Sequence, residues 1–281
     1  MINVRSPPEG KPRERVLDDA EIRVIWKTCE DWEATAIFEK EYKEKTGKPL
    51  RGGNPVSADY PRAIKLLFLL GCRAQEIGSL QWSEVDLDNR EMRIPGTRTK
   101  NKRDLCIPLC NMAVEILRSI EKRPGNNQVF GRGRRKVLGL GLSGADSNID
   151  KLIAKGGITK STVQNSLAPA GIVQSIAQVG INRRITEVGN TPPPDWTIHD
   201  IRRTFRTRLA ALGVSMDVAE ALLGHVGHRN RLVRTYDLHE RWSEKRQALV
   251  MWEANLRAIL DGTAKKIDAP RFGERKKGVT A

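Results

Sequence analysis

The stretch WTIHDIRRTFRTRLAALGVSMDVAEALLGHVGHRNRLVRTY, from Trp196 to Tyr236, is the part of the chain that decides the predicted fold. It holds three of the four histidines and a dense run of arginines, and it ends on one of only three tyrosines. Side chains that carry protons and positive charge are gathered here more densely than elsewhere. This concentration indicates that a functional site is built around the stretch.

Two helices joined by a turn are predicted within it. Apolar residues recur at three- and four-residue spacing from residue 201 to residue 212, and Gly213 then fits a helix stop. Ser215 fits the N-cap of a second helix, and Gly224 fits the end of that helix. The second helix would therefore present His225 at its end, where an imidazole is free to meet a ligand.

His199 and Arg202 are three residues apart, which places them side by side on the first turn of the first helix. The unpaired N–H groups of that helix end would join them in binding one phosphate. Taken alone, the pair is more readily explained by a plain surface or core role. The run Leu222-Leu223-Gly224-His225 and Tyr236, eleven residues further on, favour the functional interpretation.

Five short motifs follow one another along the chain: Gly71-Cys72-Arg73-Ala74-Gln75-Glu76, Thr99-Lys100, His199-Asp200-Ile201-Arg202, Leu223-Gly224-His225 and Tyr236. In this order they resemble the tyrosine recombinases, or phage integrases, and most of all the integrases of prophages and genomic islands. The likeness covers roughly residues 16 to 260. It implies an α+β, mainly α-helical fold: a tyrosine-recombinase catalytic domain with a small three-stranded antiparallel sheet.

The periodicity predicts the same sheet independently. Apolar residues alternate between Ser83 and Leu109, with Asp88-Asn89-Arg90 as the first turn and Thr97 to Arg103 as the second connection. Helices are predicted around residues 16–26, 33–48, 63–70, 112–120 and 242–259. The last of them would pack either on its own domain or on a neighbouring protomer.

The predicted domain organisation has three parts. Residues 1–15 form a basic arm, residues 16–262 the catalytic domain with insertions near 33–56 and 125–196, and residues 263–281 a disordered basic tail. Full-length integrases carry a separate DNA-binding domain ahead of the catalytic one, and the residues before Val16 are too few to form it. A fragment of a longer protein is one interpretation.

Phosphodiester transfer requires charge neutralisation on the phosphate, a nucleophile and a proton for the leaving oxygen. The resemblance assigns phosphate binding to Arg73, Arg202 and His225, proton transfer to His199 and Lys100, and nucleophilic attack to Tyr236. Glu76, three residues after Arg73, can pair with it or with another basic group and fix its direction. Lys102 is the alternative to Lys100. DNA-backbone contacts are expected from Arg98, Lys102, Arg103, Arg203 and Arg206.

No cofactor is expected, because a covalent phosphotyrosyl link preserves the energy of the broken bond without ATP or a metal. The sequence lacks a carboxylate cluster of the kind that binds magnesium. His225 and His228 have the spacing of two metal ligands, but no third ligand is suitably spaced. The four cysteines are scattered and are expected to be reduced, buried thiols.

Composition indicates the class of partner. The 281 residues carry a net charge of +15 with a pI near 9.9, which favours a polyanion, first of all double-stranded DNA and well behind it an anionic membrane surface. The chain has no apolar run long enough to span a bilayer, so a cytoplasmic, nucleoid-associated protein of a bacterium or phage is expected. The resemblance further implies self-association on DNA as a tetrameric synapse, with accessory DNA-bending or directionality proteins.

Three other functions compete with site-specific recombination of mobile DNA. A type IB topoisomerase shares the catalytic set. Against it stand Tyr236-Asp237-Leu238-His239 and the later Lys245-Arg246 with Trp252, which resemble the continuation found in integrases of prophages and genomic islands. A DNA-binding regulator without catalysis is opposed by the intact set of six catalytic candidates. A metal-dependent nuclease is disfavoured by the absent acidic cluster.

Overall fold

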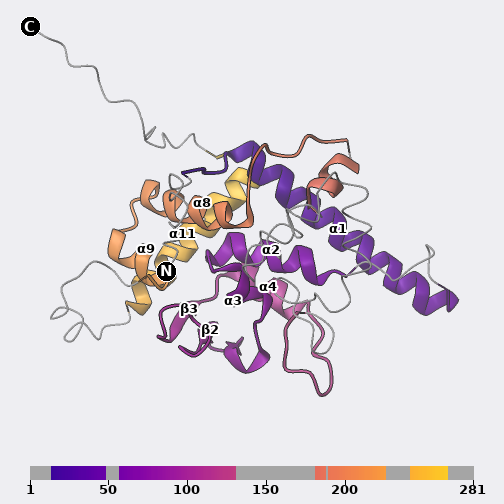
Figure 1. Ribbon diagram of the computed structural model, residues 1–281, viewed down its shortest axis with the longest axis horizontal. Coiled ribbons are helices and arrows are strands. Elements are labelled where there is room, and N and C mark those ends of the chain that lie inside the picture. The colour runs from indigo at the N-terminus through magenta and orange to yellow at the C-terminus, as the bar shows by residue number, and fades with distance from the viewer. Residues whose placement is uncertain (1–13, 49–56, 131–180, 188, 226–240, 265–281) are drawn as a thin grey trace, which may run out of the picture.

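Helices make up most of the described chain and surround one small sheet (Figure 1). The computed structural model describes residues 14–48, 57–130, 181–187, 189–225 and 241–264. Its elements are α1 (Asp19–Thr46), α2 (Asp59–Leu70), α3 (Ala74–Gly78), the 3-10 helix η1 (Trp82–Glu84), β1 (Val85–Asp86), β2 (Glu91–Ile94), β3 (Leu105–Pro108), α4 (Asn111–Arg118), α8 (Ile198–Ala211), α9 (Met216–Leu222) and α11 (Trp242–Leu260).

The three strands form an antiparallel sheet in the order β1-β2-β3. In the pairing of β2 with β3, Met92 lies opposite Ile107, and both side chains are fully buried. The turn between β1 and β2 is closed by the Asp86 carboxylate, which accepts hydrogen bonds from the backbone N–H groups of Asp88 and Asn89. The predicted α+β fold with a three-stranded sheet is therefore confirmed.

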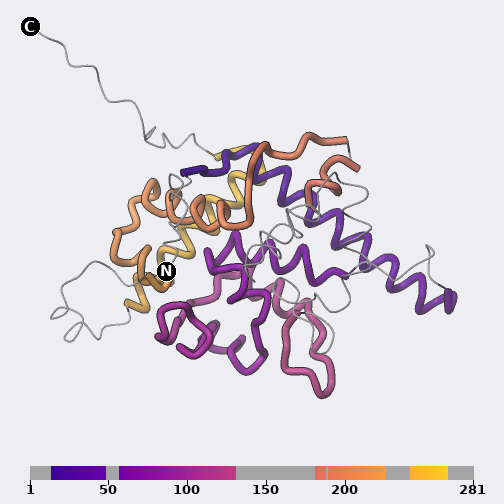
Figure 2. The backbone as a smooth tube through the Cα atoms, viewed as in Figure 1, coloured from indigo at the N-terminus to yellow at the C-terminus, as the bar shows by residue number. Residues whose placement is uncertain are grey.

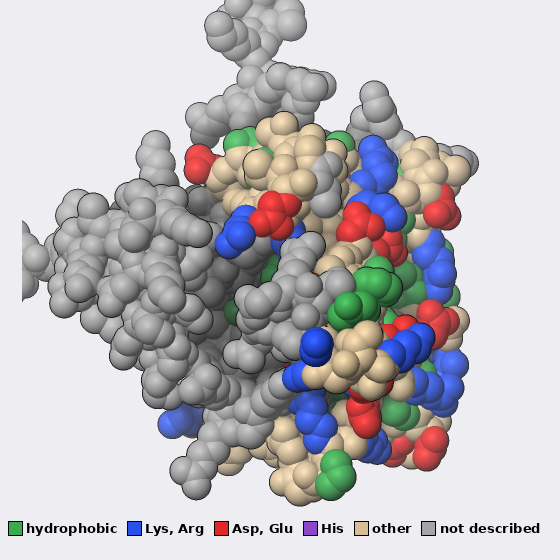
Figure 3. Space-filling model, turned by 90° about the vertical axis from the view of Figure 1, so that its right-hand side faces the viewer, with side chains coloured by type: hydrophobic (Ala, Val, Ile, Leu, Met, Phe, Trp, Pro, Cys, Tyr) green, Lys and Arg blue, Asp and Glu red, His purple; other side chains and the backbone are tan. Residues whose placement is uncertain are grey.

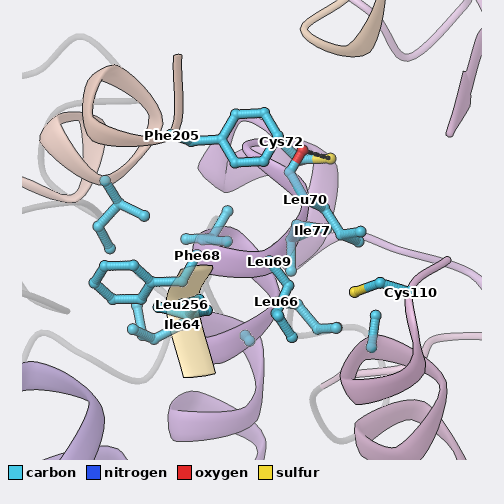
Figure 4. Packing of buried hydrophobic residues seen from close by; sticks show 14 of the residues in the cluster. Ile64, Leu66, Phe68, Leu69, Leu70, Cys72, Ile77, Cys110, Phe205 and Leu256 are labelled. Atoms are coloured by element: carbon cyan, nitrogen blue, oxygen red, sulfur yellow. Dashed lines mark hydrogen bonds between the residues drawn. The ribbon is translucent and has the colours of Figure 1, made fainter. Parts of the chain in front are cut away.

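Helix α2 is the centre of the core. Every residue from Ala63 to Leu70 is buried, and α2 packs against α1, α3, α4, α8 and α11. The run AIKLLFLL, which is apolar except for Lys65, predicts this, because a helix that is apolar on nearly all sides must be covered on nearly all sides. Figure 4 shows Phe205 of α8 beside the segment that follows Leu70, so the end of α2 is held against the helix that carries Arg202.

Helix α1 is longer than predicted. It starts at a capping box between Asp18 and Glu21 and continues without a break to Gly47, so residues 33–46 extend the first helix instead of forming a separate inserted one. The reason is that no glycine or proline interrupts residues 27–33. Its C-terminal half extends beyond the rest of the molecule (Figures 1 and 2).

Helix α11 packs on its own domain, which decides between the two predicted arrangements. Leu249, Trp252, Leu256 and Ile259 are buried, and the Trp252 indole N–H donates to the Phe68 carbonyl at 2.8 Å. The Trp252 ring also meets Phe205 edge-on, with centroids 5.7 Å apart. The C-terminal helix thus joins α2 and α8 in one core.

Several predictions fall partly or wholly outside the described residues. They concern the basic arm, the loop after α1, most of the insertion near 125–196 and the basic tail; the predicted domain boundaries therefore stay predictions. All four cysteines are buried free thiols. Among the helices that the structure describes, none is long and apolar enough to cross a bilayer.

Candidate active site

Arg73 is presented by the turn between α2 and α3. The Glu76 carboxylate accepts both the Arg73 backbone N–H and its guanidinium Nη1, each at 2.7 Å. Glu76 is buried, whereas the Arg73 side chain keeps 23% of its surface exposed. The guanidinium is therefore held in one direction while part of it remains open to a ligand.

Arg202 ties three distant segments together. Its Nη1 donates to the Gly71 carbonyl at 2.7 Å, and its Nη2 donates to the Leu223 carbonyl at 2.7 Å and to His225 Nε2 at 2.9 Å. Burial, and then the nearby Arg73, lowers the pKa of Arg202 to about 10, so the group remains a cation at neutral pH. A buried cation kept within reach of a second arginine indicates a site built for an anion.

His225 lies just beyond the end of α9, after the C-cap Leu223 and Gly224, as predicted from Ser215 and Gly224. Its Nδ1 lies 2.6 Å from Glu220 Oε2, and 41% of its side chain is exposed. Burial, followed by the Arg202 charge, lowers the pKa of His225, and Glu220 acts in the opposite direction. The resting imidazole is therefore mainly neutral at pH 7.

His199 lies on the first turn of α8 and is exposed. Although the residue is exposed, its ring loses part of its water shell to neighbouring groups, and this desolvation, followed by the charges of Arg203 and Arg202, lowers the pKa of His199. A neutral imidazole at pH 7 is able to accept a proton.

The α8 N-terminus, where the sequence predicted N–H groups available to a phosphate, begins at a capping box. Asp200 closes a capping box with Thr197: its carboxylate accepts the Thr197 N–H and hydroxyl at 2.7 and 2.9 Å. The same carboxylate also pairs with Arg203 Nη1 at 2.6 Å. None of these contacts involves the N–H groups of Ile198 and His199, so phosphate binding at this helix end stays a prediction.

A cavity of about 160 Å³ lies between Arg73, His225 and the hairpin that connects β2 and β3, whereas Arg202, His199 and Lys100 are not among the residues that line it. It is lined by Arg73, Thr99, Arg103, Asp104, Leu105, Cys106, Ala221, Gly224, His225 and Lys245. Three of the five motifs singled out in the sequence thus border one hollow. Lys245, which the sequence did not single out as a site residue, reaches it from α11 and donates to the Cys106 carbonyl at 3.0 Å.

The predicted general acid Lys100 is exposed on the turn of this hairpin. Next to it, the Asn101 amide donates to the Gly224 carbonyl at 2.6 Å, which ties the turn to the end of α9. The buried Thr99 hydroxyl donates to the Arg103 carbonyl at 2.7 Å and stiffens the turn. Asn101 was missed from the sequence, because nothing in its local pattern reveals a contact 123 residues away.

The five predicted DNA contacts fall into two groups. Arg98, Arg203 and Arg206 each have an acidic partner within the domain, namely Glu84, Asp200 and Glu220. Lys102 and Arg103 are exposed on the hairpin, and no ion pair holds them within the described part of the chain. On the face drawn in Figure 3, basic side chains are likewise interspersed with acidic ones.

The predicted nucleophile Tyr236 and the nearby His228 lie outside the described residues, so their positions stay predictions. The other two tyrosines are on α1 and α2. Tyr60 stacks on Trp32 with a centroid distance of 5.9 Å, and burial raises the pKa of its phenol. A phenol that is harder to ionise is a poorer nucleophile.

The profile of the phage integrase family matches residues 39–237. Prophage integrase IntF of Escherichia coli (strain K12) is 25% identical over 207 residues, which are 72% of this chain and 36% of that protein. Prophage integrase IntA of the same strain is 24% identical over 184 residues, or 66% and 35%.

Among solved structures, the chain is similar to the Tn1549 transposon integrase in complex with circular intermediate DNA, with a TM-score of 0.46, 15% identity and coverage of 87% and 68%. It is also similar to the XerH site-specific recombinase bound to difH, with a TM-score of 0.44, 15% identity and coverage of 79% and 52%. Because the family profile spans most of the sequence, the chain belongs to the phage integrase family. It spans about a third of the length of the two prophage integrases.

Proposed function

We propose that this chain is the catalytic domain of a site-specific DNA recombinase that integrates or excises mobile DNA. It would cleave and rejoin strands through a 3′-phosphotyrosyl intermediate, without metal or ATP. The observation that carries the proposal is Arg202, a buried cation bonded at once to Gly71, Leu223 and His225. Three segments that the family motifs mark are brought together by one guanidinium beside Arg73.

In this mechanism the two arginines neutralise the non-bridging oxygens of the scissile phosphate. Guanidinium suits this work, because its planar fork of donors matches phosphate geometry. Glu76 supports Arg73 by fixing its direction. Donors fixed before the reaction stabilise the charge that develops in the transition state without further reorganisation.

The histidines and the lysine would handle protons. The lowered pKa of His199 leaves a neutral ring that can accept the proton of the Tyr236 phenol as it attacks phosphorus. The 3′-phosphate becomes bonded to the tyrosine, the bond to the 5′-oxygen breaks, and Lys100 donates a proton to that oxygen. Rejoining is the same transfer in reverse.

Double-stranded DNA is the proposed partner, and the net charge of +15 supports it. Lys102 and Arg103, exposed at the hairpin tip, are the candidates for backbone contacts. We further propose self-association on DNA in a tetrameric synapse, accessory DNA-bending or directionality proteins, and action at the nucleoid.

The test is incubation of the protein with nicked suicide DNA in EDTA, followed by a denaturing gel. A covalent protein–DNA band that forms with EDTA present is the expected result. Absence of the band would favour a DNA-binding regulator, and cutting that EDTA abolishes would favour a metal-dependent nuclease. Relaxation of supercoiled DNA by a protein that never exchanges strands between two sites would instead indicate a type IB topoisomerase.

A further inference from the structure

Glu220 forms two short hydrogen bonds beside the site. Its Oε1 accepts Arg206 Nε at 2.6 Å, and its Oε2 lies 2.6 Å from His225 Nδ1. The Glu220 side chain is only 20% exposed, so neither contact is a loose surface pair. One carboxylate thus joins α8 to the imidazole that borders the cavity.

The geometry restricts the tautomer of His225. An ionised carboxylate can only accept, so His225 Nδ1 carries the hydrogen and donates it to Glu220. His225 Nε2 then offers its lone pair to Arg202 Nη2, 2.9 Å away. In the other tautomer, the lone pair of Nδ1 would face the carboxylate, and the hydrogen on Nε2 would face an N–H group of Arg202. Both contacts would then be repulsive, so this tautomer is disfavoured.

We propose that Glu220 is a positioning residue of this site: it holds His225 in the Nδ1-protonated form and stabilises the imidazolium that donates Nε2–H to the scissile phosphate. The inference rests on the proposed function, since it supposes a phosphate in the cavity. With that anion bound, Arg202 has an acceptor other than His225. His225 can then take a proton from solvent and bond to the phosphate as well.

The charges around His225 explain why a carboxylate is required. Arg73, Arg103 and Lys245 line the same cavity, and Arg202 touches the ring. The acids that face it are Asp104, across the cavity, and Glu220, which is hydrogen-bonded to the ring. Surrounded mainly by cations, the imidazolium depends on Glu220 for direct compensation.

Glu220 itself stays ionised. Burial acts to raise the pKa of its carboxyl, but the hydrogen bonds from Arg206 and His225 outweigh it, and the net shift is downward. Arg206 therefore has a role inside the protein in addition to any DNA contact. It keeps the carboxylate charged and directed at His225.

The experiment is an NMR titration of the histidine rings in the wild-type protein and in Glu220→Gln, with His225 assigned from the spectrum of His225→Gln. Glutamine keeps the size of the side chain but removes its charge. We expect the pKa of His225 to fall in Glu220→Gln by about one unit, the scale of one lost neighbouring charge. The alkaline limb of the pH profile for covalent-complex formation should move to lower pH by a similar amount.

Two further variants separate positioning from stability. Glu220→Asp keeps the charge and should restore most of the wild-type pKa and pH profile, even if both Glu220 variants unfold at lower temperature. Glu44→Gln, on the exposed far end of α1, should change neither quantity. An unchanged His225 pKa and tautomer in Glu220→Gln would overturn the inference. Because the titration needs no DNA, it tests the inference even if the wild-type protein fails to cleave DNA. Such a failure would overturn the proposed function instead.

Discussion

Replacing Arg202 with alanine is expected to lower the rate of covalent-complex formation by at least about 10²–10³-fold, the usual cost of losing one transition-state donor. The cause would be the loss of a cation that, in the proposed mechanism, neutralises the scissile phosphate. The fold should weaken as well, because the carbonyls of Gly71 and Leu223 lose their donor. Each buried unpaired group costs about 1–3 kcal/mol. Single-turnover cleavage of suicide DNA and urea unfolding measure the two effects.

Two matched variants show whether the effect is specific. Arg202→Lys keeps the charge but has one ammonium in place of a planar fork, so it should recover stability and rate only in part. Arg183→Ala removes an arginine that is 67% exposed, and both measurements should stay at the wild-type level. Wild-type cleavage by a folded Arg202→Ala protein would remove Arg202 from the mechanism.

Substitution of Gly71 by alanine is expected to be the most damaging small change in the core. Gly71 ends α2 with a φ of +62°, and a Cβ there would lie 2.2 Å from the Phe205 ring. The left-handed backbone costs about 1–2 kcal/mol and overpacking another 1–3 kcal/mol. We therefore expect a loss of about 2–5 kcal/mol in the free energy of unfolding, measured by urea denaturation.

The site should respond too, since the Gly71 carbonyl accepts from Arg202 and would move with the strained turn. The matched control is Gly213→Ala, where φ is +82° but no atom lies within 4 Å of the added Cβ. Gly213→Ala isolates the cost of the left-handed backbone, so this variant should lose about 1–2 kcal/mol in the free energy of unfolding and cleave DNA at the wild-type rate. Equal losses in the two variants would mean that Phe205 moves aside freely.

Local sequence patterns predicted much of the site, because the features concerned depend on neighbours within a few residues. Ser215 and Gly224 bound α9 through capping and backbone preference, and the pair placed His225 at a helix end. The alternation of β2 and β3 likewise predicted the hairpin that carries Lys100. Glu76 could be assigned to Arg73 because the two are three residues apart.

Contacts between distant segments were not predictable in this way. The link from Asn101 to Gly224 joins residues 123 apart in the sequence, and no local period encodes it. Arg206 was expected on DNA because its charge alone was visible, whereas its partner Glu220 lies on another helix.

Identifying the amino acid that carries DNA in the covalent complex tests the central claim most directly. The complex formed on suicide DNA is digested with protease and nuclease, and the modified peptide is sequenced by mass spectrometry. The chain has only three tyrosines, so the assignment is unambiguous. The account predicts a 3′-phosphotyrosyl link at Tyr236 and no covalent complex from Tyr236→Phe. A link at Tyr42, at Tyr60 or at a serine would contradict it.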